Sequence, residues 1–349
     1  QDFINLKTFY PSRHEFNDYL QWAASHFESS CAYGEEVIDV QAERHNGAVT
    51  LLRVRSRHPQ HGVRERLARS LVVAVGGAPN IPEGFAALGT HERVLHSSAY
   101  LRRIQEVLAQ PRVRKVAVIG AGQSAAEIFL DLHGRGLDVD LITRSRSIKP
   151  SDDSPFVNEI FNPEFTDYVY GKPDAQRQAL LDEFMNTNYA APDLALIEQI
   201  YNVFYRQKVA GSTRHRFLRQ HEIERVFSEG SQISLGLMDL DSGRPSMAVY
   251  DAVVLATGYV RQSHRTMLAS LQEELGDFEV QRDYRVRTPE GFRPPIFLQG
   301  ACEPTHGLSD TLLSVTSVRT GEIVSALQGS LAAAPWGLTG ARADLMVAR

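Results

Sequence analysis

The 349 residues contain only two cysteines, Cys31 and Cys302. They lie far apart and form no C-x-x-C pair, so neither a dithiol redox centre nor a structural zinc site is expected, and no metal site is predicted. The net charge of −5 argues against a broad nucleic-acid-binding surface. No apolar run approaches the ~20 residues that span a bilayer, and the start Gln1-Asp2-Phe3 lacks the features of a signal peptide. These absences predict a cytoplasmic protein without a membrane span.

An initiator methionine is also absent, and the chain starts as if a segment upstream were missing. Its length still leaves room for more than one domain. Near the start, Ser12 and Glu15 have the spacing of a capping box, which predicts that a helix begins there. Apolar residues then recur at the spacing of one helical face, at Phe16, Tyr19, Leu20, Ala23 and Phe27.

The centre of the chain carries a glycine turn between a predicted strand, Arg114–Ile119, and a predicted helix from about Ser124. The turn has the pattern G-x-G-x-x-A. Gly120 permits a tight bend, Gly122 lets the backbone approach a pyrophosphate, and Ala125 lets the helix pack closely on the strand. The first N–H groups of the helix can then face phosphate oxygens. A similar turn without a cofactor is the competing interpretation, but the flanking strand and helix favour a dinucleotide site.

The end of the following strand indicates which dinucleotide is bound. NAD sites have an acidic residue there, whereas NADP sites tend to use arginine for the extra phosphate. This chain has Leu141-Ile142-Thr143-Arg144, with Arg146 close behind. A guanidinium group binds phosphate in a bidentate manner, so the sequence predicts NADPH with Arg144 as its ligand. A solvated surface arginine is the competing interpretation.

A second predicted strand, Val249–Leu255, also ends in a glycine turn, and Leu71–Gly77 has a similar layout. Two such junctions on either side of one dinucleotide unit are typical of flavoproteins that bind two dinucleotides. The predicted fold is therefore α/β, with an FAD lobe and an inserted NADPH lobe of the Rossmann type.

Asp251–His264 matches the pattern D-x3-(L/F)-A-T-G-Y-x4-(H/P) of the amine N-hydroxylating flavin monooxygenases. The chain resembles this family and, within it, the L-ornithine N5-monooxygenases of pyoverdine-type hydroxamate siderophore synthesis. The resemblance runs through nearly the whole chain, in the stretches Asp2–Leu6, Gly120–Glu127, Asp152–Glu159, Asn186–Tyr189 and His306–Ser314.

The resemblance implies a set of site residues. The expected substrate contacts are Asn158, Glu159, Ile160, Phe161, Asn188 and Ser314. The expected NADP contacts, which include the glycine turn and Arg144, are Gly120, Ala121, Gly122, Gln123, Ser124, Arg144, Asn188, Tyr189 and Ala190. The expected FAD contacts are Val37, Thr311, Leu312 and Leu313. Thr311 is also expected to begin a helix that runs to about Leu327, and no residue is assigned as a general acid or base.

A local structural role is the competing interpretation for the two asparagines, because Asn158 and Asn188 are of a type that often caps loops and helix ends.

The resemblance also implies a domain organisation. Residues 1–80 are expected to be the remainder of the FAD lobe, and 81–248 the NADPH lobe, with a Rossmann unit at 113–147 and a helical substrate-binding segment at 150–210. Residues 249–330 are expected to return to the FAD lobe, and 331–349 to form a tail. The family's FAD-binding G-x-G-P-x-N turn, and a nearby lysine that binds the substrate carboxylate, would lie upstream of Gln1. The N-terminus is therefore expected to be truncated.

The implied reaction is L-ornithine + NADPH + O2 giving N5-hydroxyornithine, with FAD as the second cofactor, in a homo-oligomer. L-Lysine N6-hydroxylation is one alternative, because one methylene is difficult to discriminate. A non-catalytic nucleotide-binding fragment is another. A disulfide reductase would need a cysteine pair, which this chain lacks.

Overall fold

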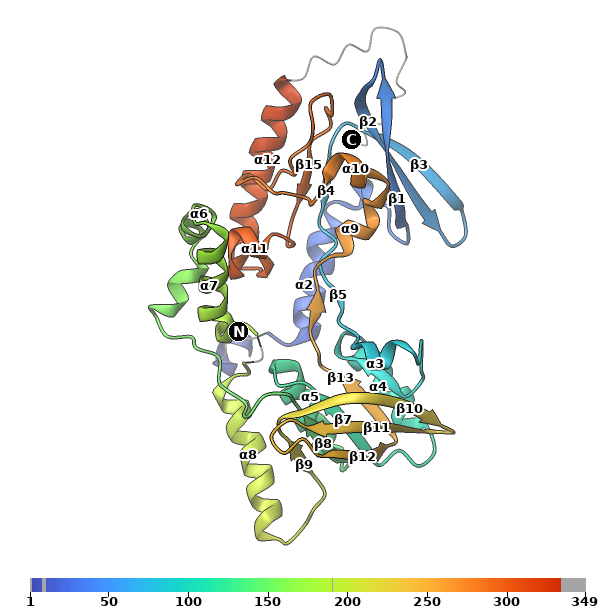
Figure 1. Ribbon diagram of the computed structural model, residues 1–349, viewed down its shortest axis with the longest axis vertical. Coiled ribbons are helices and arrows are strands. Elements are labelled where there is room, and N and C mark those ends of the chain that lie inside the picture. The colour runs from blue at the N-terminus through green and yellow to red at the C-terminus, as the bar shows by residue number, and fades with distance from the viewer. Residues whose placement is uncertain (1, 8–10, 190, 334–349) are drawn as a thin grey trace.

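The computed structural model describes residues 2–7, 11–189 and 191–333. Two lobes lie at opposite ends of the molecule and are joined by short extended segments (Figure 1). We call the lobe built on the five-stranded sheet the Rossmann lobe, and the lobe that contains β1–β4, β15 and α9–α12 the second lobe.

The Rossmann lobe is built on a parallel sheet whose five strands are in the order β6-β13-β7-β8-β9. The strands are β6 (Val94–His96), β13 (Ala252–Leu255), β7 (Lys115–Ile119), β8 (Asp138–Ile142) and β9 (Arg216–Leu218). Side chains alternate between the two faces along a strand. In β7, Val116 and Val118 therefore join the core under the helices, whereas Ala117 and Ile119 join the core on the opposite face.

Different layers cover the two faces of this sheet. Helices cover one face: α4 (Tyr100–Ala109), α5 (Gln123–Gly134) and α8 (Leu194–Val209). An antiparallel sheet and a short helix cover the other: β10 (His221–Glu229), β11 (Gln232–Asp239), β12 (Pro245–Tyr250) and α3 (Glu83–Ala86). The succession β7, α5, β8 is the strand–helix–strand unit that the glycine turn predicted.

The second lobe combines a meander with a short parallel pair. Its strands are β1 (Glu36–His45), β2 (Ala48–His58), β3 (Gly62–Ala68), and β4 (Leu71–Val73) paired with β15 (Ile296–Leu298). Its helices are α9 (Ser263–Met267), α10 (Gln272–Leu275), α11 (Glu303–His306) and α12 (Thr316–Ala333). Leu52, Phe297 and Ile323 meet in one core, so the strands and α12 form one packed unit.

The two lobes are connected where β5 (Ala78–Pro79) pairs with β14 (Tyr259–Val260). Next to this pair, the Asn80 side chain donates to the Thr257 carbonyl at 3.1 Å, and the Asn80 N–H donates to the Gly258 carbonyl at 2.9 Å. The boundary at residue 249 needs correction, because β13 is hydrogen-bonded between β6 and β7 inside the Rossmann sheet. The chain returns to the second lobe at β14.

The predicted helical segment 150–210 is divided between the lobes. α8 covers the Rossmann sheet, whereas α6 (Pro163–Tyr170) and α7 (Asp174–Phe184) pack against α11. The short 3-10 turns are η1 (Glu28–Ser30), η2 (Ser97–Ala99), η3 (Val157–Phe161), η4 (Met185–Thr187), η5 (Ala269–Leu271) and η6 (Leu308–Thr311).

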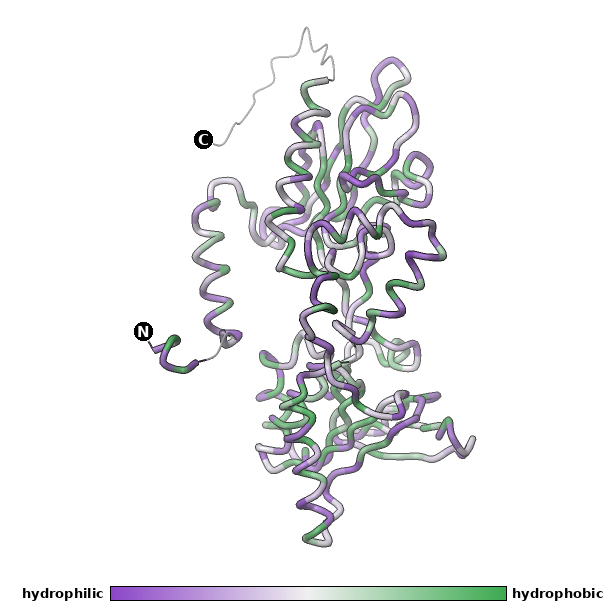
Figure 2. The backbone as a smooth tube through the Cα atoms, turned by 90° about the vertical axis from the view of Figure 1, so that its left-hand side faces the viewer, coloured by the Kyte–Doolittle hydropathy of each residue, from purple (hydrophilic) through white to green (hydrophobic). Residues whose placement is uncertain are grey.

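The N-terminal part contains α1 (Asp2–Leu6) and α2 (Arg13–Ser25). The predicted capping box is confirmed: the Ser12 hydroxyl accepts the Glu15 N–H at 3.2 Å, and the Glu15 carboxylate accepts the Ser12 N–H at 2.7 Å. The apolar face of α2 is nevertheless exposed, and most of the helix stands apart from both lobes (Figure 2). At its start, Arg13 lies 3.3 Å from the Glu127 carboxylate of α5. Within the described ranges, no helix is both long and apolar enough to cross a bilayer.

Candidate functional site

A cleft with a volume of about 520 Å³ lies in the second lobe, between the segment that follows β14 and the helix α11. Its walls include the side chains of Arg261, His264 and Glu303, together with Tyr189 from the segment after η4. The lining is therefore both charged and aromatic, a combination found in sites that bind polar ligands.

Tyr189 brings the predicted site segments together. Its hydroxyl donates a hydrogen bond to a carboxylate oxygen of Glu303. Burial and this carboxylate raise the pKa of Tyr189, while the nearby Thr311 side chain and the charge of Arg261 oppose the shift. η3, which carries Asn158, packs against η6, which ends at Thr311. The Asn158 loop, the Asn188–Tyr189 segment and the start of 311–314 thus converge.

The predicted substrate loop has a well-defined local structure. The Asn158 side chain donates to the Asp153 carbonyl at 2.8 Å, and its backbone N–H donates to the Ser154 carbonyl at 2.9 Å. Asn158 and Glu159 are exposed and Phe161 is half-buried, whereas Ile160 is only 4% exposed and packs inward. The Asn158 amide thus has the loop-capping contact that was the competing interpretation, and Ile160 has a packing role.

Asn188 caps the C-terminal end of η4, and its N–H donates to the Met185 carbonyl at 3.3 Å. The Tyr189 N–H donates to the same carbonyl at 2.9 Å, which places the phenol directly after Asn188 in a fixed turn. Ala190, a predicted NADP contact, lies outside the described residues.

The glycine turn has the geometry of a phosphate cradle. Gly120 adopts φ +144°, and a Cβ placed there would come within 2.3 Å of the Ala256 carbonyl oxygen. Gly122 is the N-cap of α5 in an extended conformation, so the first N–H groups of the helix open toward the turn. Ala121 is buried, and Gln123 and Ser124 are half-buried. The Gln123 side chain forms two hydrogen bonds with Asp193 at the start of α8. Its amide N–H donates to the Asp193 carboxylate at 3.0 Å, and its amide oxygen accepts the Asp193 N–H at 2.9 Å.

Arg144 follows the end of β8 directly after the buried Thr143. β7 and β8 are neighbours, and the Gly120 N–H donates to the Ile142 carbonyl at 2.9 Å, so Arg144 lies on the same sheet edge as the turn. Its side chain is 77% exposed and lies 3.6 Å from a Glu222 carboxylate oxygen. An exposed pair of this kind is weak, so the guanidinium is available to an anion.

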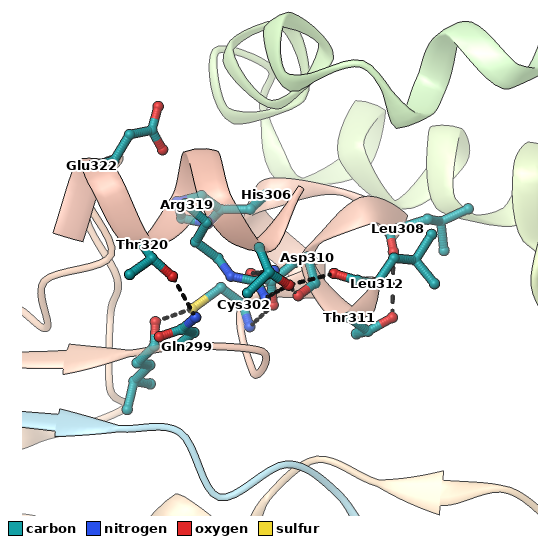
Figure 3. Close-up of polar contacts among 12 residues, drawn as sticks. Gln299, Cys302, His306, Leu308, Asp310, Thr311, Leu312, Arg319, Thr320 and Glu322 are labelled. Carbon is teal, nitrogen blue, oxygen red and sulfur yellow. Dashed lines mark hydrogen bonds and ion pairs between the residues drawn. The ribbon is translucent and has the colours of Figure 1, made fainter. Parts of the chain in front are cut away.

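The helix predicted from Thr311 to Leu327 is wrong at its start. Thr311 ends η6, Leu312 is extended with φ −97° and ψ 155°, and α12 begins at Thr316. A buried ion pair holds this turn (Figure 3): Arg319 binds the carbonyl of Asp310 and lies 3.5 Å from its carboxylate, whose other oxygen accepts the Cys302 N–H at 2.7 Å. The remaining predicted residues, Leu313 and Ser314, are exposed.

Comparison with known proteins gives a consistent result. Residues 1–261 match the model of the L-lysine 6-monooxygenase/L-ornithine 5-monooxygenase family. The L-ornithine N(5)-monooxygenase of Pseudomonas aeruginosa is 50% identical over 329 residues, which are 93% of this chain and 74% of that protein. The chain belongs to this family. The membership confirms the resemblance inferred from the motifs.

Solved structures of related enzymes agree with the fold. The ornithine hydroxylase of P. aeruginosa has a TM-score of 0.89 at 48% identity, over 95% of this chain and 79% of that one. The ornithine N-hydroxylase of Kutzneria sp. 744, solved with reduced FAD, NADP+ and L-ornithine, has a TM-score of 0.86 at 33% identity, over 94% and 79%. The expected fold of a flavoprotein with two dinucleotide-binding lobes is thereby confirmed.

The residues of this family member fit a pyridine dinucleotide, because a Cβ would fill the cradle at Gly120 and Arg144 is positioned for a phosphate. Toward a flavin the chain offers fewer groups. Val37 is half-buried on β1, and Leu313 leaves 70% of its apolar side chain in water after the turn at Thr311.

No motif in the sequence identified Glu303 or Asp310 as a candidate site residue. Burial raises the pKa of both carboxyl groups, and Arg261 opposes the shift at each. Asp310 lies within the stretch His306–Ser314 that resembles the family, so the acidic residue was visible in the sequence, but its burial and its partner Arg319 were not. Nothing in the sequence pairs Glu303 with Tyr189, which is 114 residues away.

Proposed function

We propose that this protein hydroxylates the side-chain amine of L-ornithine, with NADPH, FAD and O2 as the other participants. The product is N5-hydroxyornithine, a precursor of hydroxamate siderophores. The family membership supports the reaction class, and the 50% identical relative from P. aeruginosa, named for ornithine, supports the substrate. The related Kutzneria enzyme was solved with FAD, NADP+ and L-ornithine together, which supports the cofactors.

In this proposal the chain binds, orients and shields the reactants. The turn at Gly120 and the N-terminus of α5 hold the dinucleotide phosphates, and Arg144 binds the 2′-phosphate. Bound FAD supplies the reaction with O2. Asn158 and Asn188 orient the amine through neutral amide groups, which do not repel a cation. An alkylamine has a pKa near ~10.4 in water, so the pocket has to favour its uncharged form by desolvation.

The observation that carries the proposal is the convergence at Tyr189. Tyr189 lies in the segment expected to contact substrate and dinucleotide. Its bond to Glu303 joins that segment to α11, which leads into η6 and Thr311, where the flavin is expected to bind. Reactants that exchange electrons and oxygen have to be held within contact distance, so the two sets of residues must lie side by side.

The test is turnover by the purified protein supplied with FAD and NADPH, with L-ornithine or L-lysine as substrate and hydroxylamine detection by mass spectrometry. We expect N5-hydroxyornithine as the dominant product. If only lysine is hydroxylated, the substrate is L-lysine, the alternative that the family description also covers. Failure to bind FAD, even after it is added, would favour the non-catalytic nucleotide-binding alternative. We further propose a cytoplasmic homo-oligomer, which centrifugation and cell fractionation would test.

A further inference from the structure

The hydrogen bond between Tyr189 and Glu303 connects two distant parts of the chain inside the cleft. The Tyr189 hydroxyl donates to the Glu303 carboxylate, and both side chains line the cavity. Tyr189 directly follows Asn188 in the turn at the end of η4. Glu303 is the first residue of α11, which leads through His306 into η6. The bond therefore ties the Asn188 segment to the element that precedes Thr311.

The surroundings of this bond make it stronger than a surface contact. Both side chains are half-buried, and desolvation raises the pKa of each group. Hydrogen bonds to a carboxylate are roughly twice as strong as those between neutral groups. Arg261, which also lines the cleft, provides a positive charge that favours the ionised form of Glu303. Tyr189 and Glu303 thus form a directional hydrogen bond in a site that is partly shielded from water.

We propose that Glu303 is a positioning residue: it holds the phenol of Tyr189 across the cleft and thereby fixes the neighbouring Asn188 for substrate and dinucleotide. The inference rests on the proposed function and names a residue through which that site is ordered. Glu303 acts through Tyr189, so its effect depends on the presence of the phenol hydroxyl.

The first test measures order directly in the intact protein. Hydrogen exchange, read by mass spectrometry on a peptide containing Asn188 and Tyr189, is compared in Glu303→Ala, Tyr189→Phe and the unsubstituted protein. We expect exchange of this peptide to accelerate by about tenfold in both variants, the factor produced by the loss of one hydrogen bond. Tyr189→Phe keeps the ring and removes only the hydroxyl, so it separates the bond from packing. Unchanged exchange in both variants would overturn the proposal.

The second test measures NADP+ binding by calorimetry in the same variants. We expect weaker binding in each single variant and no further loss in the double variant, because both changes break one bond. Glu303→Gln retains an acceptor oxygen and should restore most of the affinity. Losses that multiply in the double variant would contradict the proposal. The control is Glu92→Gln, outside the cleft, whose carboxylate is 70% exposed; it should leave exchange and binding unchanged.

The two proposals fail in different ways. If exchange and NADP+ binding respond as expected but ornithine is not hydroxylated, the positioning role holds and the proposed reaction is wrong. If ornithine is hydroxylated while Glu303→Ala changes neither the exchange nor the ratio of kcat to KM, the reaction holds and the positioning role is wrong.

Discussion

At the scale of single residues, Gly120 shows how one missing side chain makes a binding site. Its φ of +144° lies in a region that side chains disfavour, and its Cα packs against the carbonyl of Ala256 at the end of the neighbouring strand. The turn can therefore bend sharply and leave its N–H groups open.

Replacing Gly120 with Ala should lower the free energy of unfolding by roughly 2 kcal/mol or more, because the backbone would be strained and the Cβ would overlap the Ala256 oxygen. NADP+ binding should fall with it. Chemical denaturation and calorimetry measure the two effects. Gly134→Ala is the matched control at the end of α5, where no atom lies within 4 Å of the added Cβ; it should cause no loss of stability.

Arg144 determines, in our interpretation, which dinucleotide is used. Arg144→Ala should weaken NADPH binding by roughly tenfold or more, since a hydrogen bond to a charged group is lost, and should leave NADH binding nearly unchanged. Titration of both dinucleotides measures the effect. Arg146→Ala, which removes another exposed arginine from the same loop, serves as the control. Equal losses with both dinucleotides would contradict the assignment.

At the scale of elements, the segment between η6 and α12 has no regular structure of its own and depends on its anchors. Asp310 accepts the Cys302 N–H at 2.7 Å and binds Arg319 from α12, and all three residues are buried. The ion pair and this hydrogen bond connect the start of α11, η6 and α12, and thereby set the path of Thr311–Ser314.

Asp310→Ala should cost about 3–5 kcal/mol of unfolding free energy, because the Arg319 charge would be left buried without its partner. Arg13→Ala removes one member of an exposed pair, in which the two side chains are 69% and 40% exposed, and should cost less than about 1 kcal/mol. Urea denaturation compares the two variants. Similar costs would show that the buried pair does not hold the turn.

At the scale of the whole molecule, each lobe has its own hydrophobic core, and the connection between the two lobes is narrow. Each lobe also contains a buried histidine: His215 accepts the Val139 N–H in the Rossmann lobe, and His306 stacks on Tyr284 in the second lobe. Burial lowers the pKa of each of these imidazoles to about 4, so both are neutral at pH 7.

This arrangement predicts the pH dependence of stability. The unfolded chain binds protons on these histidines near pH 6.5, whereas the folded chain resists protonation to about pH 4. The contribution of these two histidines to the free energy of unfolding is complete above pH 6.5 and is lost as the pH falls toward 4. Melting temperatures measured across this range should decline less steeply in His215→Gln and His306→Gln than in the unsubstituted protein. The exposed His14→Gln should leave the slope unchanged.

Local patterns in the sequence determined the capping box at Ser12, the strand–turn–helix around Gly120 and the position of Arg144 after β8. These features depend on hydrogen bonds and steric limits among residues that are close along the chain. The ordered series of motifs also sufficed to indicate the family and the type of fold.

Only the tertiary structure decided how Tyr189 meets Glu303, how Arg319 meets Asp310, and that β13 lies inside the Rossmann sheet. The helix expected at Thr311 failed for the same reason, since bonds from Cys302 and Arg319 hold the turn before it in place. Contacts of this kind depend on how separate elements pack, and side-chain spacing along one element contains no information about the partner it will reach.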